Sequence, residues 1–390
     1  MRILLIKGRS LYSGTRLFLD LAADAFQAVG HEVEMLDLLD TPDPRALITD
    51  HAADAGSVDL IFTISILGEF RDPAGRSLSD LYGAPHVLWH VDYILGQFPR
   101  LEATPASTAL LFIDPTQVEA VRATYGADRF AHLDFMPHAA VGTPALDADA
   151  TGFAARPIPL LFSGSFQKPE TAFENISRDL HRPLQDAIDL ALSREWIAPH
   201  LAVEQALGAR GFNMSDPDNR GLLRLAGRVD DTVRRTRRFE FLKAVGKARL
   251  PLHICGAGWD AQLYRFKQGT YHGAIEMTQM TELMRQARVV LNTNVNFGAG
   301  SHERPLSALL AGAAPFTDVS AFYASEFGAD AMAFYHWRDL DGAMTKLQAL
   351  LDMPAEAHAI AAKGHAKVLA AHTWPNRIAQ IIAAGDAVRV

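Results

Sequence analysis

The stretch that decides the fold reads NTNVNFGAGSHERPLSALLAGAAPFTD and spans Asn292–Asp318. An apolar run, Val289–Leu291, comes directly before it, and a glycine-containing loop leads into Ser-His-Glu-Arg-Pro. A segment of small apolar residues then ends at Gly312, and a second short apolar run follows at Ala314–Thr317. Because apolar runs bounded by glycine and polar residues are typical of buried strands, the pattern predicts a strand, a glycine loop, a helix and a second strand.

The start of the predicted helix has the features of an anion site. Pro305 suits the first helical turn, where a missing N–H leaves no hydrogen bond unmade. The free backbone N–H groups of that turn, with the cation Arg304 beside them, attract negative charge. The segment therefore predicts half of a binding site for a nucleotide-sugar donor.

The N-terminal part of the chain alternates apolar runs with helical patterns. Arg2–Ile6 is the first run, and Thr15–Val29 follows with apolar residues at helical spacing until Gly30 ends it. Continuous apolar strands separated by helices are typical of a parallel sheet that is covered on both faces. We therefore predict an α/β, Rossmann-like domain over residues 1–145. Its strands are expected at 2–6, 33–36, 58–67, 86–91, 108–113 and 132–136.

A second α/β domain is predicted over residues 159–374, after a proline- and glycine-containing linker at 146–158. Residues 167–230 read as a helical insertion in this domain, with helices expected at 170–197 and 199–211. Because loops longer than about 15 residues in compact domains are usually functional or disordered, we expect the insertion to shape acceptor choice or partner contact rather than donor binding. The strands of this domain are expected at 159–166, 250–256, 287–293 and 313–318.

The second domain resembles bacterial GT-B glycosyltransferases of the spore-maturation (CgeB-like), group 1 type. The resemblance rests on GAGW at Gly256–Trp259, on the Met277–Met284 helix before VVLNTN, and on SHERPLSALLAGA, and it covers residues 157–384. It implies a GT-B-like fold, in which two Rossmann-like parallel-sheet domains face a central cleft and a C-terminal helix, here 375–390, packs back on the first domain. It also implies a nucleotide-diphosphate-sugar donor on the second domain and the acceptor on the first.

One position departs from the family pattern. Related retaining enzymes usually carry a second glutamate on the helix after the glycine loop, where it faces the donor ribose. This sequence has Glu303, but Ser307 stands at the expected second position. The retaining or inverting outcome of the reaction is therefore left open.

Candidate donor contacts come from four parts of the second domain. In FSGSFQKP (162–169), glycine permits close backbone approach, and serine and lysine side chains can bind phosphate oxygens. The basic segment Arg224–Arg249 is either a solvated face or supplies one or two arginines to the pyrophosphate. Trp259 either flanks the base or packs at a domain edge. The predicted donor contacts are Gly164, Ser165, Lys168, Arg235, Gly256, Gly258, Trp259, Asn292, Asn294, Ser301, His302, Arg304 and Ser307.

Candidate catalytic groups lie mainly in the first domain. His90 and Asp92 end a predicted strand, and their i, i+2 spacing places them on one face. A base near the acceptor hydroxyl is required for inverting transfer, and histidine and aspartate are suitable. Glu303, with His302, competes for this role on the donor side. The predicted acceptor-side contacts, at strand ends of the first sheet, are Arg9, Ser10, Gly14 and His138.

Composition narrows the function classes. With 37 Lys and Arg against 45 Asp and Glu, the net charge of −8 disfavours a general nucleic-acid binder. The single cysteine, Cys255, lies in an apolar strand and indicates a buried thiol in a reduced compartment. No metal-ligand spacing or membrane-length apolar run is seen. We expect a cytoplasmic protein without a metal or other cofactor.

The sequence therefore predicts a glycosyltransferase that moves a sugar from a nucleotide-diphosphate-sugar, without a metal, to an acceptor that it does not identify. Two alternatives stay open. One is a nucleotide-sugar epimerase of the same fold, and the other is an inactive GT-B-shaped binding or scaffold protein. A homodimer is also left open.

Overall fold

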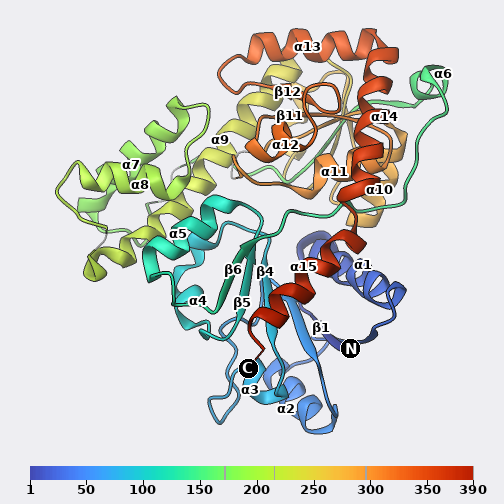
Figure 1. Ribbon diagram of the computed structural model, residues 1–390. Coiled ribbons are helices and arrows are strands. Elements are labelled where there is room, and N and C mark those ends of the chain that lie inside the picture. The colour runs from blue at the N-terminus through green and yellow to red at the C-terminus, as the bar shows by residue number, and fades with distance from the viewer. Residues whose placement is uncertain (171–172, 215, 295–296, 390) are drawn as a thin grey trace. The chain divides into compact units, whose positions relative to one another are not determined.

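The computed structural model describes residues 1–170, 173–214, 216–294 and 297–389 (Figure 1). The chain forms two compact units. Met1–His138 and Thr373–Val390 make the first, and Ala139–His372 make the second. Each unit is built on a six-stranded sheet in which all neighbouring strands are parallel. The predicted α/β class with two parallel sheets is confirmed.

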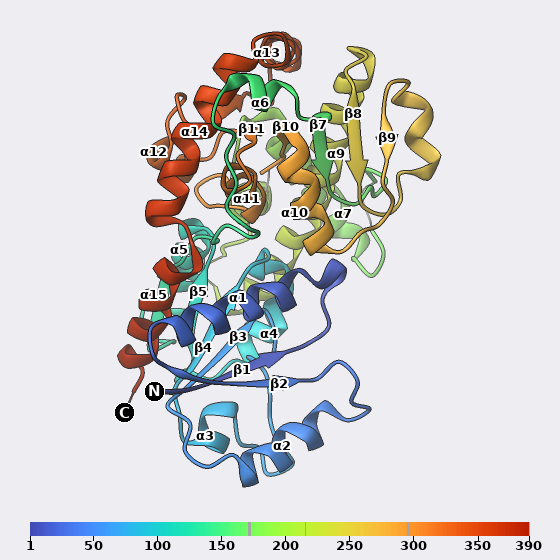
Figure 2. The same cartoon turned by 90° about the vertical axis from the view of Figure 1, so that its right-hand side faces the viewer.

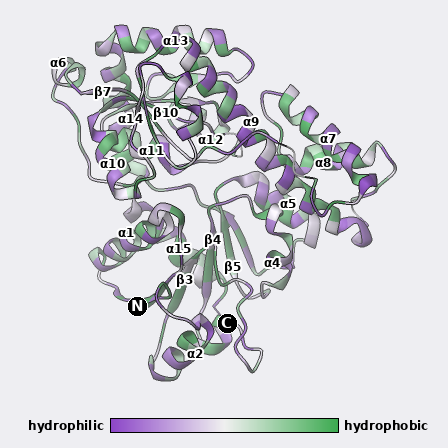
Figure 3. Cartoon of the chain, turned by 180° about the vertical axis from the view of Figure 1, so that it is seen from behind, coloured by the Kyte–Doolittle hydropathy of each residue, from purple (hydrophilic) through white to green (hydrophobic). Residues whose placement is uncertain are grey.

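The sheet of the first unit has the order β2-β1-β3-β4-β5-β6. Its central strands are buried along their whole length, which explains their continuous apolar runs (Figure 3). Leu4 and Ile6 pack with Ile48 and Leu78 on the face that carries α2 and α3, and α1 and α15 lie on the other face (Figure 2). The strands are β1 (Arg2–Lys7), β2 (Glu32–Asp37), β3 (Leu60–Ile64), β4 (His86–His90), β5 (Ala109–Phe112) and β6 (His132–Phe135).

The helices of the first unit include the last helix of the chain. Trp374, at the start of α15, packs edge-on against Trp89 of β4, and the Arg377 side chain donates to the Pro137 carbonyl at 2.9 Å. The C-terminal helix thus belongs to the first unit although its sequence follows the second. The helices are η1 (Leu11–Ser13), α1 (Gly14–Ala28), α2 (Pro44–Asp54), α3 (Leu78–Tyr82), η2 (Ile94–Gln97), α4 (Phe98–Ala103), α5 (Pro115–Tyr125) and α15 (Trp374–Ala387).

The sheet of the second unit has the order β12-β11-β10-β7-β8-β9. Phe162 and Phe316 on the strands pack with Phe241 of α9 and Leu347 of α13 in one core cluster. Helices α10 and α11 contact each other, and they contact β7, β10 and β11. The strands are β7 (Ile158–Ser163), β8 (Leu252–Cys255), β9 (Thr270–Tyr271), β10 (Ala287–Leu291), β11 (Ala314–Asp318) and β12 (Ala333–Tyr335).

The segment expected as a linker is part of the second unit. Residues 146–158 contain a short helix, and Phe153 on it is fully buried in the core cluster of this unit. Arg156 pairs with Asp147 at 2.6 Å and donates to the Ala287 carbonyl at 2.8 Å. The sequence did not indicate these contacts, because the segment has few apolar residues. The contacts come from the Phe153 ring and the Arg156 side chain. The helices here are α6 (Ala150–Ala154), α10 (Met277–Gln286), α11 (Glu303–Leu310), α12 (Ala321–Glu326), α13 (Leu340–Asp352) and α14 (Pro354–Ala371).

The insertion is helical, with different bounds from those predicted. Its helices α7 and α8 pack on each other and on α9 (Figure 1). The arginine-rich helix α9 begins at Leu225. Thr171, Ala172 and Ser215 of the predicted insertion lie outside the described residues. The elements of the insertion are α7 (Arg178–Ser193), α8 (Pro199–Gly208) and η3 (Pro217–Arg224), and the next helical elements of the unit are α9 (Leu225–Lys247) and η4 (Asp260–Arg265).

Candidate functional site

The strand order of the second unit reverses between β7 and β10, which are neighbours in the sheet but not in the chain. In open α/β sheets, ligands bind outside the carboxyl ends of the strands at such a reversal. Arg304 of α11 lies across this point. Its Nε donates to Ser163 Oγ at the end of β7 at 2.8 Å, and its Nη1 donates to Asn292 Oδ1 just after β10. The predicted cation is therefore placed at the reversal.

A second arginine joins Arg304 at the carboxyl end of β7. Arg238 of α9 donates from Nη1 to the Ser165 carbonyl at 2.9 Å. The guanidinium carbons of Arg238 and Arg304 lie 5.8 Å and 5.9 Å from the centroid of the Phe162 ring. Among the described residues, no carboxylate forms an ion pair with either arginine. We call Arg238 and Arg304 the cation pair.

The electrostatics of the cation pair favour an anion. Burial, together with the charges of Arg304 and Arg234, lowers the pKa of Arg238 to about 9, and burial also lowers the pKa of Arg304. The Nε of Arg238 is buried without a hydrogen-bond acceptor in the described part of the chain. Two cations that repel each other and are partly withdrawn from water gain free energy when an anion binds near both of them.

The start of α11 is fixed by a buried tyrosine. Tyr323 of α12 is fully buried, and its hydroxyl accepts from the His302 N–H and donates to the His302 carbonyl, both at 2.7 Å. His302 Nδ1 lies 2.7 Å from Glu303 Oε2 and 3.3 Å from the backbone nitrogen of Arg304. Burial lowers the pKa of His302, although Glu303 opposes this. The histidine and the glutamate thus form a pair in the first turn of the helix.

The asparagines after β10 are held by β11. Asn292 Nδ2 donates to Thr317 Oγ1 at 2.9 Å, and the Asn294 N–H donates to the Asp318 carboxylate. Burial raises the pKa of Asp318 to about 6. Asn294 Oδ1 is buried without a hydrogen-bond donor among the described residues. The segment is therefore a buried polar network, and Val295 and Asn296 of the predicted loop lie outside the described residues.

The GAGW motif has a structural role that differs from the predicted one. Trp259 is fully buried in the core, and its ring N–H donates to the Gly164 carbonyl at 2.7 Å, so it does not flank a base. A Cβ on Gly256 would lie 2.5 Å from the Gly164 oxygen, and one on Gly258 would lie 2.6 Å from the Phe166 oxygen. At these two glycines the closely packed neighbour is the backbone of residues 164–166 rather than a nucleotide. Gly164 itself has φ of 155°, which favours glycine.

Three other predicted donor contacts are occupied by protein groups. Ser307 is 1% exposed; its hydroxyl accepts from the Val141 N–H at 2.9 Å and donates to the Glu303 carbonyl at 2.9 Å. It therefore cannot replace the missing ribose-binding glutamate without breaking these bonds. Arg235 is paired with Asp231, and Lys168 is exposed and paired with Glu170.

The remaining predicted donor residues lie near the cation pair. Ser165 lies on the loop after β7, and its carbonyl accepts from Arg238. Ser301 is fully buried just before the first turn of α11. Both stay candidate contacts, Ser165 through its side chain and Ser301 through the backbone that it positions.

The structure does not support His90 as a general base. His90 ends β4, and its ring is buried and stacked on Phe112 with centroids 5.4 Å apart. Burial lowers its pKa to about 3, too low for effective proton abstraction at neutral pH. Asp92 is exposed and lies beyond the end of β4. The i, i+2 spacing therefore does not place it on the same face as His90, because that rule applies only within a strand.

Two first-unit predictions have different outcomes. His138 is 2% exposed and packs against the rings of Phe18 and Trp89, which is a core position rather than an acceptor contact. Arg9, in contrast, is exposed on the loop after β1. This loop lies at the reversal of the first sheet, between β1 and β3.

The β1–α1 loop contains Ser10 and Gly14, the other two predicted acceptor contacts. Ser10 Oγ accepts from the Thr15 N–H at 3.0 Å, and Gly14 begins α1. Tyr12 and Ser13 have φ of 54° and 55°, a left-handed conformation that is costly for residues other than glycine. Strain of this kind is common at functional sites.

Sequence reasoning missed Asp318 and Tyr323 as parts of the candidate site, and from the basic segment it selected Arg235 rather than Arg238. Arg238 was one arginine in a run of four, and only helical phase separates it from its neighbours. Arg237, the adjacent residue, donates to the carbonyls of Ala191, Arg194 and Glu195 and so has a structural role. The position of Asp318 at the carboxyl end of a predicted strand was the one available signal for a site residue.

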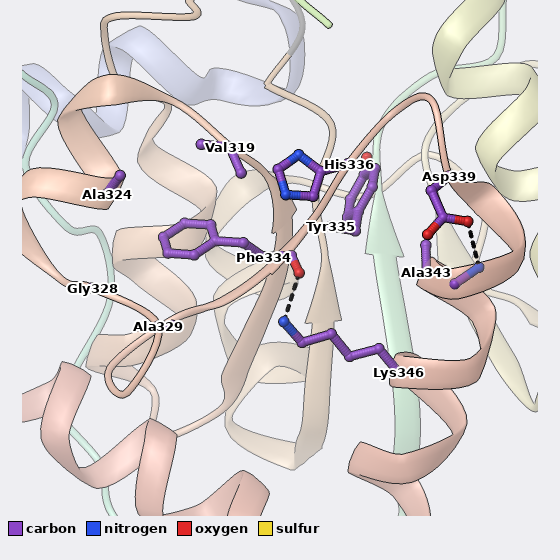
Figure 4. Close-up of a pocket in the computed structure, with 11 residues that line it drawn as sticks. Val319, Ala324, Gly328, Ala329, Phe334, Tyr335, His336, Asp339, Ala343 and Lys346 are labelled. Carbon is purple, nitrogen blue, oxygen red and sulfur yellow. Dashed lines mark hydrogen bonds between the residues drawn. The ribbon is translucent and has the colours of Figure 1, made fainter.

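A separate cavity of about 480 Å³ lies beside the edge strand β12, between α12 and α13 (Figure 4). Figure 4 shows Lys346 reaching the Phe334 carbonyl, to which it donates at 2.8 Å, and Asp339 accepting from the backbone at the start of α13. These polar groups are already partnered, and β12 is two strands from β10. We assign this cavity no part in the candidate site.

Two further findings apply to residues 1–170, 173–214, 216–294 and 297–389. No group of three or more histidine, cysteine, aspartate or glutamate side chains there is arranged to hold a metal ion. No helix there has both the length and the apolarity to cross a membrane. Cys255 is 2% exposed, as expected, and burial raises its pKa to about 12.

Comparison with known proteins gives a partial match in sequence. Residues 234–383 match the model of the Glycosyl transferase-like family, which is less than half of the chain. A search of curated protein sequences finds no significant match. The matched region contains Arg238, Arg304 and the polar network after β10.

Comparison with solved structures identifies the fold. The chain is similar to a sucrose-phosphate synthase from Thermosynechococcus elongatus, with 12% identity, a TM-score of 0.56, and 98% of this chain and 97% of that chain covered. It is also similar to Anabaena HepE in complex with UDP and glucose, with 13% identity, a TM-score of 0.55, and 98% of this chain and 99% of that chain covered. A third similar structure is an alpha-glucosyltransferase in complex with UDP and a 13-mer DNA containing a HMU base, with 10% identity, a TM-score of 0.56, and 100% of each chain covered. The fold is therefore the two-domain α/β fold of GT-B glycosyltransferases.

Proposed function

We propose that this protein is a glycosyltransferase whose second unit binds the diphosphate of a nucleotide-sugar at the cation pair and the start of α11. The observation that carries the proposal is Arg304, which lies across the strand reversal and is joined there by Arg238. The match of residues 234–383 to the Glycosyl transferase-like family supports the same assignment. The UDP named for two of the structural neighbours makes UDP the first nucleotide to test.

The proposed chemistry follows from the charges. Breaking the bond between the sugar and the diphosphate leaves negative charge on the departing phosphate oxygen. Arg238, Arg304 and the positive end of the α11 dipole would stabilise that charge where it develops. A fixed cation pair can supply the electrostatic stabilisation that a divalent metal supplies in other transferases, so we propose that transfer does not require a metal.

Glu303 is the proposed carboxylate next to the reacting centre. It lies in the first turn of α11, one residue before Arg304, and His302 holds it at 2.7 Å. A carboxylate in this position can stabilise positive charge that develops on the sugar ring as the bond breaks. Arg9 and Ser10, at the reversal of the first sheet, are the proposed acceptor contacts.

An inactive binding protein is the second candidate, and Ser307 favours it. The ribose-binding glutamate of related retaining enzymes is absent, and the Ser307 hydroxyl is used within the unit. Such a protein would bind a nucleotide-sugar and leave it intact.

The test is donor hydrolysis by the purified protein. Thermal-shift screening of UDP-, GDP-, ADP-, CMP- and dTDP-linked sugars finds the donor, because a ligand of the folded state raises the melting temperature. The best ligand is then incubated with the protein, with and without EDTA, and release of the nucleoside diphosphate is measured. We expect slow release that Glu303→Gln abolishes and EDTA does not change. Binding without release would favour the inactive binding protein, and absence of binding by every donor would refute both.

A further inference from the structure

The insertion touches the loop that leads into α11. A Cβ added to Gly298 would overlap the fused ring of Trp196, so the indole lies directly on this glycine. Trp196 lies between α7 and α8, about a hundred residues before Gly298 in the chain. We call Arg194–Trp196 the insertion corner and Phe297–Ser301 the donor loop. The contact between them connects a segment that a compact nucleotide-binding fold does not need to the proposed site.

The insertion corner is held firmly from the other side. Glu195 Oε1 accepts from the Trp337 N–H at 2.8 Å, and the Glu195 carbonyl accepts from Arg237 at 2.9 Å. Arg237 is 3% exposed, and its guanidinium carbon lies 5.2 Å from the centroid of the Trp337 ring. A buried arginine that donates to two carbonyls of the corner and to the Ala191 carbonyl of α7 fixes the backbone from which Trp196 projects.

The donor loop is also held by hydrogen bonds, among them one from Asn294 Nδ2 to the Phe297 carbonyl at 2.8 Å. The Gly298 carbonyl accepts from the Ala321 N–H at 2.8 Å, and the Gly300 N–H donates to the Phe297 carbonyl at 3.1 Å. The loop joins the end of the Asn292–Asn294 segment to His302. Because the loop leads directly into His302, its position acts together with the Tyr323 hydroxyl to set where the pair of His302 and Glu303 lies.

We propose that Trp196 is a positioning residue for the donor sugar. It presses on Gly298 and holds the donor loop so that Glu303 faces the sugar while the cation pair holds the diphosphate. The proposal rests on the proposed function. It also revises the sequence-based expectation that the insertion acts on the acceptor or a partner, because the corner lies on the donor side of the second unit.

The position requires glycine at 298 for lack of space. Any side chain there would collide with Trp196, and this collision makes the two positions dependent on each other. Trp196 also has a buried ring N–H with no acceptor among the described residues. Replacement by phenylalanine keeps a flat ring on Gly298 and removes this N–H, so it tests whether the ring itself is what positions the loop.

The experiment compares nucleotide affinity with sugar-dependent turnover. UDP-glucose, GDP-mannose, ADP-glucose and dTDP-glucose are screened, and the donor with the highest affinity for the wild type is used with its free nucleoside diphosphate. For Trp196→Ala we expect nucleotide affinity within about twofold of wild type and donor hydrolysis slowed about 10- to 100-fold, as expected for misplaced reacting groups. Trp196→Phe should restore most of the rate. Phe212→Ala, which removes an exposed aromatic ring of the same insertion, is the control and should match wild type.

A double-mutant cycle tests the contact itself. Gly298→Ala should slow hydrolysis in the wild-type background, and it should cost much less in Trp196→Ala, where the ring is gone. Equal loss in both backgrounds, or a Trp196→Phe variant as slow as Trp196→Ala, would overturn the positioning role. Unchanged hydrolysis in Trp196→Ala would also overturn it. If no donor binds the wild-type protein, the proposed function fails, and melting temperatures in the same cycle still decide whether the contact exists.

Discussion

The carboxyl edges of the two sheets differ in how their polar groups are arranged. In the second unit, Arg304 is buried and bonded to Ser163 and Asn292, so that the strand reversal is closed by a preformed network. In the first unit, the loop at the reversal is open. Leu11 there is 74% exposed, Arg9 is exposed, and Tyr12 and Ser13 have left-handed backbones.

This difference fits two kinds of ligand. A buried network of fixed cations recognises a ligand of constant charge and shape, such as a diphosphate, at little cost of reorganisation. An exposed and strained loop is easily changed in sequence and is suited to a variable ligand, such as an acceptor. The comparison therefore predicts that loss of Arg304, which closes the second reversal, affects stability and nucleotide binding together, and that mutations at the first reversal affect neither strongly.

Arg304→Met should have the largest effect. It leaves Ser163 Oγ and Asn292 Oδ1 buried without their donor, and we expect a loss of about 2–4 kcal/mol in the free energy of unfolding. Nucleotide binding should fall as well. Chemical denaturation and calorimetry measure the two effects. A fully stable variant would show that the network is not preformed and would remove the main contrast between the two edges.

Glu303→Gln should affect chemistry only. The amide keeps the size of the side chain but loses the charge, and we expect donor hydrolysis to fall about 100-fold or more. The affinity for the free nucleoside diphosphate should stay within about threefold, since the cation pair is intact. A large loss of nucleotide affinity with unchanged hydrolysis per bound donor would reject the proposed role of this carboxylate.

Because of Asp318, the free energy of unfolding should depend on pH in a characteristic way. Its pKa is about 6 when folded, against an ordinary value of 3.8, so the folded state binds the proton more tightly. The resulting stabilisation is fully present below the ordinary pKa and is lost as pH rises through about 6. Relative to Asp318→Asn, the wild type should gain about 1 kcal/mol of stability between pH 7 and pH 5.

The comparison with Asp318→Asn is needed because buried histidines act in the opposite direction. Burial lowers the pKa of His86 and of His90 to about 3, so both variants lose stability as pH falls below the ordinary histidine pKa. Taking the difference between the variants removes this shared loss. Parallel stability curves for the two proteins would contradict the raised pKa of Asp318.

Ser13→Gly should have the smallest effect, and a favourable one. Glycine accepts φ of 55° without strain, although it also increases the entropy of the unfolded chain, so we expect a gain of about 0.5–1 kcal/mol. Ser10→Gly, which removes the acceptor of the Thr15 N–H, is the contrasting variant and should destabilise. Destabilisation by Ser13→Gly would show that the loop is not strained.

The strands and the helix after the glycine loop could be predicted from the sequence because their signals are local. Val289–Leu291, the polar residues after it and Pro305 specify a strand end and a helix start within a few positions. The α/β class follows from the same alternation along the chain. These features depend on neighbours in sequence, so one sequence is enough to see them.

The site residues that were misplaced depend on distant partners. Trp259 and Ser307 read as ligand contacts because their residue types suit such roles, but Gly164 and Val141 occupy their polar groups. His90 was assigned by strand alternation, and its burial against Phe112 could not be seen from spacing. The sequence does not show that Arg238, rather than a neighbouring arginine, points to the site, because this depends on how α9 packs on the sheet. In each case the deciding partner lies on another element of the fold.

The central claim is that the cation pair binds a diphosphate, and Arg238 allows the most direct test. Unlike Arg304, it holds one backbone carbonyl, so its removal should leave the network at the reversal intact. Calorimetric titration of UDP and of uridine is carried out on wild type, on Arg238→Gln and on the control Arg224→Gln, an exposed arginine that directly precedes the same helix. We predict that Arg238→Gln weakens UDP binding by about 1.5–3 kcal/mol, leaves uridine binding unchanged, and that Arg224→Gln matches wild type. Equal UDP affinity in wild type and Arg238→Gln, with both proteins folded, would contradict the account.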